Sequence, residues 1–125
     1  MGEKNLLIVG GSSGIGLEMV RFLAEQPCNT YVASRDAGPL SEMKDVRHLP
    51  LDVTAESIDL DDLPEELHGI AYCPGTIVLK PFQRLSVEDF MQDYRINLLG
   101  AVKVIQACLK QLKKSSSGAS IVLFS

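Results

Sequence analysis

Short apolar runs alternate with segments of helical pattern along the chain, and this alternation limits the fold more than any other feature of the 125 residues. Each run is continuous rather than interleaved with polar residues, which is typical of strands in a parallel sheet that is buried on both faces. Right-handed crossovers between such strands favour a doubly wound sheet. We therefore predict a Rossmann-type α/β fold in a single domain, residues 1–125, with strand order 3-2-1-4-5. The predicted strands are Leu6–Val9, Thr30–Ala33, Val46–Leu51, Gly69–Cys73 and Ile121–Phe124.

Three helices are expected between these strands. Leu17–Glu25 is amphipathic, and a short helix is predicted over Ser41–Lys44. A long helical pattern begins at Ser86, where Asp89 completes what resembles a capping box, and apolar residues recur at helical spacing as far as Leu112. Asn97 and Gly100 interrupt this long pattern near its middle.

An acidic segment precedes the fourth predicted strand. It contains Glu56, Asp59, Asp61, Asp62, Glu65 and Glu66 around three apolar residues, with Pro64 interrupting. A site for a cation or a basic partner is one interpretation. Charge runs usually mark solvent-facing segments, so a poorly formed surface helix is the favoured one.

A Gly/Ser loop joins the first predicted strand to the first helix. It contains Gly10, Gly14 and Gly16, a spacing that differs from the common G-x-G-x-x-G fingerprint, and no Lys follows as it would in a P-loop. Glycine allows positive φ and close approach of a ligand, and the start of a helix attracts anions through its free N–H groups and its dipole. The loop therefore predicts an anion site, with an ordinary strand-to-helix turn as the alternative.

Polar residues follow the carboxyl ends of the second and third predicted strands, the edge at which doubly wound sheets bind ligands. Arg35 stands 19 residues after Gly16. An acid there suits the ribose 2′-OH of NAD, whereas the guanidinium fork suits a 2′-phosphate. We therefore favour NADP(H) over NAD(H), although Asp36 would serve NAD after a shift of one residue. Asp52 is expected to accept from the adenine amine, to cap the turn at Val53-Thr54, or both.

Composition excludes several other classes of function. The net charge of −4 argues against a nucleic-acid partner, which would need clustered Lys and Arg. Three isolated cysteines and two isolated histidines show no metal-ligand spacing, so no metal is expected and the thiols are interpreted as reduced, in a cytoplasmic protein. The first apolar run is too short for a signal peptide or a membrane span, so no membrane association is expected.

The chain resembles the short-chain dehydrogenase/reductase family over essentially all of its length. Five segments carry the resemblance, and they occur in the family's order. Val9–Gly16 is similar to the family's T-G-x-x-x-G-I-G cofactor loop, and Leu51–Thr54 is similar to its adenine-contacting D-V-T segment. Tyr72–Gly75 stands in place of the N-N-A-G segment, and Asn97–Gly100 is similar to the N-x-x-G segment. Ser120–Ser125 is similar to the strand that leads to the catalytic Ser.

The chain also departs from the family pattern. Val9 replaces the usual Thr, and only Gly75 of the N-N-A-G segment is retained. Ser125 aligns with the residue before the catalytic Ser, and no Tyr-x-x-x-Lys occurs in the chain. An apolar strand at Ile121–Phe124 with no helix after it would be an exposed sheet edge. We therefore expect residues 1–125 to be the N-terminal, cofactor-binding part of a longer single-domain enzyme, truncated after the fifth strand and inactive alone.

The resemblance implies an oxidoreductase that transfers hydride between a nicotinamide and a small-molecule carbonyl or secondary alcohol. Asn97 would take part in the catalytic proton relay, and full-length homo-oligomers would form through the long helices. A non-catalytic dinucleotide sensor or scaffold is the alternative, and a methyltransferase is disfavoured by Arg35. The residues implied to bind the cofactor are Gly10, Ser12, Ser13, Gly14, Ile15 and Gly16 in the loop, then Ser34, Arg35, Asp52, Val53, Cys73 and Gly75.

Overall fold

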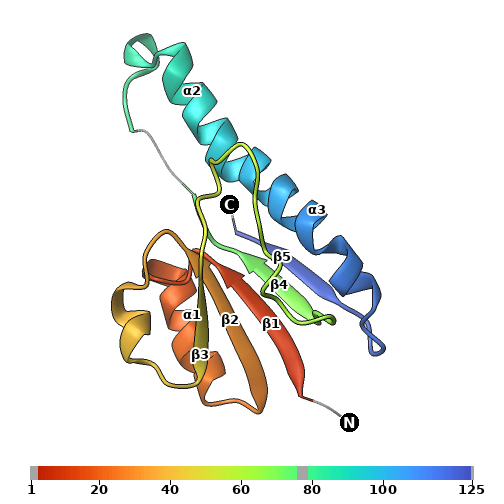
Figure 1. The fold of residues 1–125 in the computed structure, drawn as a ribbon. Coiled ribbons are helices and arrows are strands. Elements are labelled where there is room, and N and C mark those ends of the chain that lie inside the picture. Colours follow the sequence, from red (N-terminus) through yellow and green to blue (C-terminus); the bar gives the residue numbers. More distant parts are fainter. Residues whose placement is uncertain (1–2, 76–78, 125) are drawn as a thin grey trace.

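A five-stranded parallel sheet forms the centre of the computed structural model, which describes residues 3–75 and 79–124 (Figure 1). The strand order is β3-β2-β1-β4-β5, and each neighbouring pair is parallel. The predicted fold class and strand order are both confirmed. The strands are β1 Lys4–Val9, β2 Cys28–Ser34, β3 Val46–Pro50, β4 Gly69–Tyr72 and β5 Ser120–Leu123.

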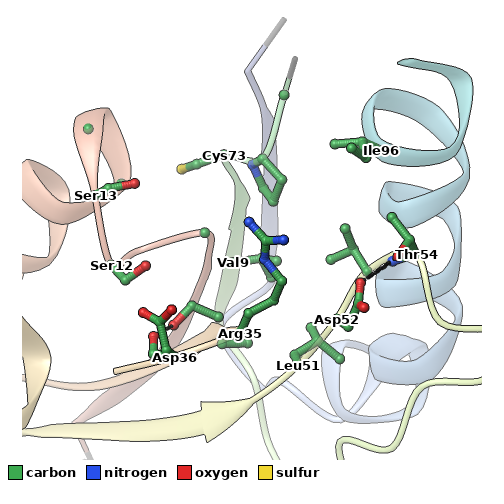
Figure 2. A pocket seen from close by; sticks show the side chains of 18 of the residues that line it. Val9, Ser12, Ser13, Arg35, Asp36, Leu51, Asp52, Thr54, Cys73 and Ile96 are labelled. Atoms are coloured by element: carbon green, nitrogen blue, oxygen red, sulfur yellow. Dashed lines mark hydrogen bonds between the residues drawn. The ribbon is translucent and has the colours of Figure 1, made fainter. Parts of the chain in front are cut away.

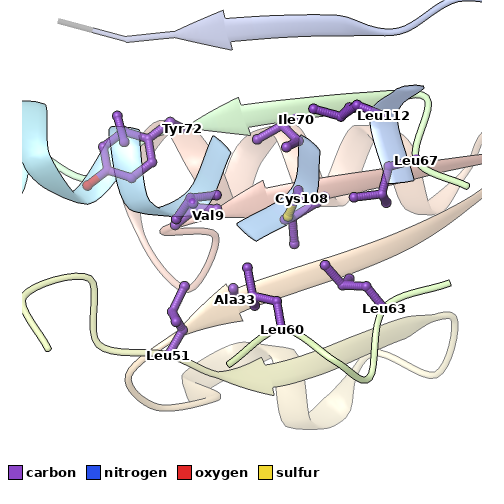
Figure 3. Close-up of a cluster of buried hydrophobic side chains, with 13 residues drawn as sticks. Val9, Ala33, Leu51, Leu60, Leu63, Leu67, Ile70, Tyr72, Cys108 and Leu112 are labelled. Carbon is purple, nitrogen blue, oxygen red and sulfur yellow. The ribbon is translucent and has the colours of Figure 1, made fainter. Parts of the chain in front are cut away.

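Helices cover both faces of the sheet because its side chains alternate between two apolar clusters. On one face, Ile8 and Val32 pack against Leu17 and Val20 of α1, Gly14–Ala24. The other face packs against α3, Gly100–Lys113, and forms the larger cluster shown in Figure 3. The members of that cluster are Leu7, Val9, Ala33, Leu51, Leu60, Leu63, Leu67, Ile70, Tyr72, Ala101, Val104, Cys108 and Leu112.

The acidic segment corrects one prediction, because residues 56–66 form no helix. The Asp59 carboxylate accepts a hydrogen bond from the Asp61 N–H at 2.9 Å, a local turn that competes with helix formation. Leu60 and Leu63 are buried and cover part of the sheet beside α3. The segment is therefore an apolar cover with acidic residues on its outer side, and not a surface helix.

The long helical pattern is interrupted where the sequence suggests. It consists of α2, Val87–Tyr94, a π-helical turn at Arg95–Leu99, and α3. The capping box is confirmed, since Ser86 Oγ accepts from the Asp89 N–H at 3.1 Å and Asp89 Oδ2 accepts from the Ser86 N–H at 3.0 Å. Instead of the short helix predicted over 41–44, a 3₁₀ helix spans Gly38–Glu42 and buries Leu40 in the cluster that contains Ile8 and Val32. A second 3₁₀ turn, Phe82–Arg84, precedes α2.

Large apolar side chains remain exposed on several elements, among them β5 and α2. The edge strand β5 is exposed along its whole length, as predicted for an open edge. Helix α2, which extends beyond the end of the sheet in Figure 1, has no buried residue. Ser125, on which part of the resemblance rests, lies outside the described residues. Within the described part of the chain, no helix has the length and apolar character needed to cross a membrane.

Candidate functional site

A pocket of about 440 Å³ opens at the carboxyl ends of β1, β2 and β4 (Figure 2). Its walls come from the Gly/Ser loop, the turns that follow β2 and β3, the segment after β4, and one face of the long helix. Every residue proposed from sequence to bind a cofactor lines it. These residues are Gly10, Ser12, Ser13, Gly14, Ile15, Gly16, Ser34, Arg35, Asp52, Val53, Cys73 and Gly75.

The Gly/Ser loop needs glycine at several positions for different reasons. Gly10 and Gly14 have positive φ values of 79° and 57°, a region that favours glycine. A side chain at Gly16 would collide with the carbonyl oxygen of Gly10, whereas a Cβ at Gly14 would meet nothing within 4 Å. The loop is thus packed tightly on the protein side and is open at Gly14, where a ligand can approach the backbone.

The start of α1 presents backbone donors to this open space. Ser13 is the N-cap, but its side chain makes no capping hydrogen bond, and the first turn contains no acidic residue. The first intrahelical bond runs from the Leu17 N–H to the Ser13 carbonyl oxygen at 3.1 Å. The N–H groups before Leu17 have no partner within the helix. A helix start of this kind attracts anions through such N–H groups and through the helix dipole, and the anion site expected from the loop sequence stays a prediction.

Arg35 brings a cation to the same pocket from the end of β2. Its guanidinium extends into the pocket between the loop of Ser12 and the turn of Asp52 (Figure 2). Within residues 3–75 and 79–124, no ion pair or hydrogen bond to Arg35 is found. The guanidinium is therefore available to a ligand.

The Ser34 hydroxyl is already engaged. It donates to the Asp36 carbonyl oxygen at 2.6 Å and lies 2.8 Å from His48 Nε2. Because a hydroxyl has one proton, Ser34 could donate to a ligand only by releasing Asp36.

The turn after β3 is held by its own hydrogen bonds. Asp52 Oδ1 accepts from the Thr54 N–H at 2.9 Å and from the Thr54 hydroxyl at 2.6 Å, so the predicted capping role of Asp52 is confirmed. The hydroxyl bond and then the backbone bond lower the pKa of the Asp52 carboxyl, and the positive charges of Arg35 and Lys103 act in the same direction. Lys103 of α3 also donates to the Ala55 carbonyl oxygen at 2.6 Å, which attaches this turn to the helix.

The segment after β4 closes the pocket against the Gly/Ser loop. The Cys73 N–H donates to the Val9 carbonyl oxygen at 2.9 Å, and the Pro74 ring lies 3.0 Å from where a Cβ on Gly10 would stand. Burial raises the pKa of the Cys73 thiol. Pro74 has no N–H to donate, so it contributes to this segment by packing its ring against Gly10.

Asn97, the residue expected in a proton relay, does not itself line the pocket. It lies behind Gly75, where a Cβ would stand 3.1 Å from Asn97 Oδ1. Sequence reasoning missed Gln92 and Ile96, which line the pocket from the long helix. The available signal was their spacing, because residues four apart share one helix face.

Tyr72 connects the sheet to the π-helical turn. Its hydroxyl donates to the Ile96 carbonyl oxygen at 2.5 Å and occupies the space left by the missing side chain of Gly100. Burial raises the pKa of Tyr72 to about 12, so the hydroxyl keeps its proton and remains a donor. The turn that carries Ile96 and Asn97 is thereby fixed against β4.

A model of the family described as short chain dehydrogenase matches residues 4–125. A 3-amino-tetrahydro-pyrrolizinone reductase of Xenorhabdus hominickii is 30% identical over 124 residues, which cover 92% of this chain and 43% of the relative. Retinol dehydrogenase 8 of Homo sapiens is 27% identical over 139 residues, which cover 98% of this chain and 44% of the relative. The chain thus spans less than half the length of these two relatives.

Solved structures share the fold. A serine dehydrogenase from Escherichia coli matches with a TM-score of 0.81 at 22% identity, covering 94% of this chain and 59% of that one. A carbonyl reductase from chicken fatty liver, crystallised with NADPH, matches with a TM-score of 0.78 at 21% identity, covering 97% and 58%. At these identities the two structures support the fold alone. With a family model that matches almost every residue described, this chain belongs to the short chain dehydrogenase family.

Proposed function

We propose that this chain forms the cofactor site of an NADP(H)-dependent oxidoreductase that acts on a carbonyl compound or a secondary alcohol. The observation that carries the proposal is that the Arg35 guanidinium and the start of α1 line the same pocket. A dinucleotide with a 2′-phosphate carries anionic groups at two places along its length. The pocket offers donors for anions at two places as well.

The residues of the pocket fit such a cofactor. The N–H groups at the start of α1 would hold the pyrophosphate, and the open backbone at Gly14 leaves room for it. Arg35 would grip the 2′-phosphate through its planar fork. The Asp52 carboxylate oxygen that makes no bond to Thr54 would accept from the adenine amine, with Val53 beside the ring. When bound, the nicotinamide supplies or accepts the hydride.

The names of related proteins support the class of reaction. One relative is a reductase and another a retinol dehydrogenase, and one structural neighbour is a carbonyl reductase crystallised with NADPH. Oxidation or reduction of a small molecule is the chemistry that these names share, and two of them name an alcohol or a carbonyl as the group that reacts. We extend it to the protein that contains this chain.

The proton donor of the reaction is not assigned within these residues. None of the three tyrosines, Tyr31, Tyr72 and Tyr94, is followed by Lys four residues later, so the chain has no Tyr-x-x-x-Lys. Tyr72 is committed to the Ile96 carbonyl oxygen, and burial disfavours its ionisation. We propose that residues 1–125 bind the cofactor, that Asn97 orders water behind Gly75, and that the 125-residue chain alone does not turn over substrate.

The proposal is tested by comparing the affinities of NADPH and NADH by calorimetry. Wild type should bind NADPH more tightly, and Arg35→Ala should weaken NADPH by about ten- to a hundredfold, since a hydrogen bond to a charged group contributes about 1.5–3 kcal/mol. NADH should change little. Arg21→Ala is the matched control, because Arg21 is also a surface arginine but pairs with Glu18 away from the pocket. If Arg35→Ala weakened the binding of NADPH and NADH equally, Arg35 would not be a ligand of the 2′-phosphate.

A second candidate function is favoured by the absence of Tyr-x-x-x-Lys from the sequence. In this alternative the protein binds the dinucleotide without catalysis, as a sensor or scaffold. Both candidates predict the same binding data. Oxidation of NADPH by the full-length gene product in the presence of a panel of aldehydes and ketones separates them, because only the enzyme consumes the cofactor.

Assembly and location are further parts of the proposal. Exposed apolar residues lie along the long helix, among them Phe90 of α2, Leu98 of the π-helical turn and Leu109 of α3, and they suit contact between copies in a homo-oligomer. The three cysteines are unpaired, which suits the reducing cytoplasm. Sedimentation of the full-length protein tests the first point, and fractionation of the source cell tests the second.

A further inference from the structure

A hydrogen-bonded chain lies beneath Arg35 and joins β2 to β3. Ser34, the last residue of β2, is 7% exposed, and its hydroxyl donates to the Asp36 carbonyl oxygen at 2.6 Å. His48 Nε2, from the neighbouring strand β3, lies 2.8 Å from the same hydroxyl oxygen. In the β2–β3 register His48 is opposite Val32, so the imidazole reaches Ser34 along the edge of the sheet.

The direction of each hydrogen bond follows from the chemistry of the three groups. A carbonyl oxygen only accepts, so the single proton of the Ser34 hydroxyl is directed to Asp36. The hydroxyl oxygen must then accept from His48, which requires the proton to be on Nε2. The chain therefore runs from His48 through Ser34 to the Asp36 carbonyl, with no second arrangement that keeps both bonds.

These bonds hold the backbone on both sides of Arg35. Ser34 precedes it and Asp36 follows it, and the bond between them closes a tight turn with Arg35 at the apex. The guanidinium extends into the pocket (Figure 2), while the Asp36 carboxylate lies toward the Gly/Ser loop. A Cβ on Gly38 would be 3.7 Å from Asp36 Oδ1 and 3.8 Å from the Ser12 carbonyl oxygen, which places this carboxylate near Ser12.

We propose that His48, acting through Ser34, is a positioning residue for cofactor discrimination, because it keeps Arg35 rather than Asp36 at the place of the 2′-phosphate. This inference rests on the proposed function and adds a residue that touches no cofactor. Arg35 and Asp36 are adjacent and opposite in charge, so a small rotation of the turn exchanges a phosphate-binding cation for a ribose-binding carboxylate. Loss of the hydrogen-bonded chain should therefore change the preference between the dinucleotides more than the affinity for both.

The arrangement allows the positioning role to be separated from a general structural one. The Leu51 N–H donates to the Ser34 carbonyl oxygen at 2.9 Å, so the backbone pairing of β2 and β3 does not depend on the imidazole. A variant at residue 48 can thus lose the side-chain bonds and keep the sheet. His48→Leu removes the donor, whereas His48→Gln retains an amide N–H that can donate to Ser34.

The experiment measures dissociation constants for NADPH and NADH in the full chain by calorimetry, with thermal unfolding as a check of folding. His48→Leu should weaken NADPH by about three- to tenfold, the range expected for one hydrogen bond, and should leave NADH within about twofold of wild type. His48→Gln should recover most of the NADPH affinity. His48→Ala should reproduce His48→Leu, and it provides the same test if the leucine variant does not fold.

Two results separate failure of this inference from failure of the proposed function. If Arg35→Ala abolishes the preference for NADPH but His48→Leu and His48→Ala weaken both dinucleotides equally, the positioning role is wrong and the proposed function stands. If wild type shows no preference for NADPH, or Arg35→Ala does not change it, the proposed function and the inference fail together.

Discussion

Gly100→Ala gives a stringent test of how the long helix is attached to the sheet. Replacing glycine by alanine inside a helix normally stabilises it by about 1 kcal/mol. At this position the new Cβ would overlap the Tyr72 hydroxyl and would lie 3.0 Å from Val53 Cβ and 3.2 Å from Val53 Cγ2. Overpacking of this kind costs about 1–3 kcal/mol. Withdrawal of the hydroxyl would also break its bond to Ile96, which contributes about 1 kcal/mol.

Together these terms predict that Gly100→Ala lowers the free energy of unfolding by about 1–3 kcal/mol, opposite in sign to an ordinary helical glycine. Tyr72→Phe alone should cost about 1–2 kcal/mol, because the Ile96 carbonyl loses its donor. In the Tyr72→Phe background the hydroxyl obstacle is gone. Gly100→Ala should then cost at least about 1 kcal/mol less than in wild type, a coupling within the range for contacting residues.

Urea unfolding followed by circular dichroism measures all four members of this cycle. Tyr31→Phe is the control, because Tyr31 packs against the same cluster and its hydroxyl has no hydrogen-bond partner among the described residues. It should change stability by less than about 0.5 kcal/mol. Additive effects of Gly100→Ala and Tyr72→Phe, or a stabilising Gly100→Ala in wild type, would refute the proposed packing.

Three further predictions concern the loop, the helix cap and the turn after β3. Gly16→Ala should lower the free energy of unfolding by about 1–3 kcal/mol and abolish dinucleotide binding, because the new Cβ meets backbone atoms that cannot move away. Gly14→Ala has open space around its Cβ but a positive φ, so it should cost about 1–2 kcal/mol. Thermal melts in which Gly14→Ala is the less stable variant would contradict the loop geometry. Ser86→Ala should lower the free energy of unfolding in urea by about 1 kcal/mol, because the capping box is lost. The affinity for the dinucleotide should stay at the wild-type value, and a change in it would mean that the stability of α2 affects binding in the pocket. Thr54→Val should raise the pKa of Asp52 toward its ordinary value of 3.8, as measured by carboxyl NMR titration. Because the pKa of Asp52 is lowered in the folded protein, the bonds of its carboxylate stabilise the protein above pH 3.8. The difference in unfolding free energy between wild type and Thr54→Val should therefore be largest near neutral pH and should decrease as the pH falls through the pKa of Asp52 in the folded protein. A difference that does not depend on pH would exclude this linkage.

Much of the fold could be predicted from sequence because strands in a parallel sheet have a strong local signature. The apolar runs identify all five strands to within about two residues at each end, and the crossover rule then determines their order. The acidic segment was misjudged because its outcome depends on tertiary burial. Leu60 and Leu63 are buried in the same cluster as side chains of α3, a contact between distant parts of the chain that no local pattern shows.

The candidate pocket was predictable to the extent that its residues follow strand ends. The doubly wound topology brings those ends together, so the loop, Arg35, Asp52 and Gly75 converge as expected. Gln92 was missed because its orientation toward the pocket depends on how the long helix is attached. That attachment is made by the Tyr72 hydroxyl and Gly100, and the sequence shows this tyrosine only as a departure from the family pattern.

The partnership of Ser34 with His48 was also beyond sequence analysis. The two residues are 14 positions apart, and only the β2–β3 register determines which imidazole lies beside which hydroxyl. The sequence therefore suggested Ser34 as a direct phosphate ligand. The hydrogen bond of the Ser34 hydroxyl instead shows that this side chain holds the turn on which Arg35 stands.

The central claim is that this pocket recognises a 2′-phosphate through Arg35. The most direct test compares two small ligands that differ only in that group, 2′,5′-ADP and 5′-AMP, by calorimetry on wild type and Arg35→Ala. We predict that wild type binds 2′,5′-ADP at least about tenfold more tightly than 5′-AMP, and that the two affinities become equal within about twofold in Arg35→Ala. Equal affinities in wild type, or a preference that survives the loss of Arg35, would contradict the claim.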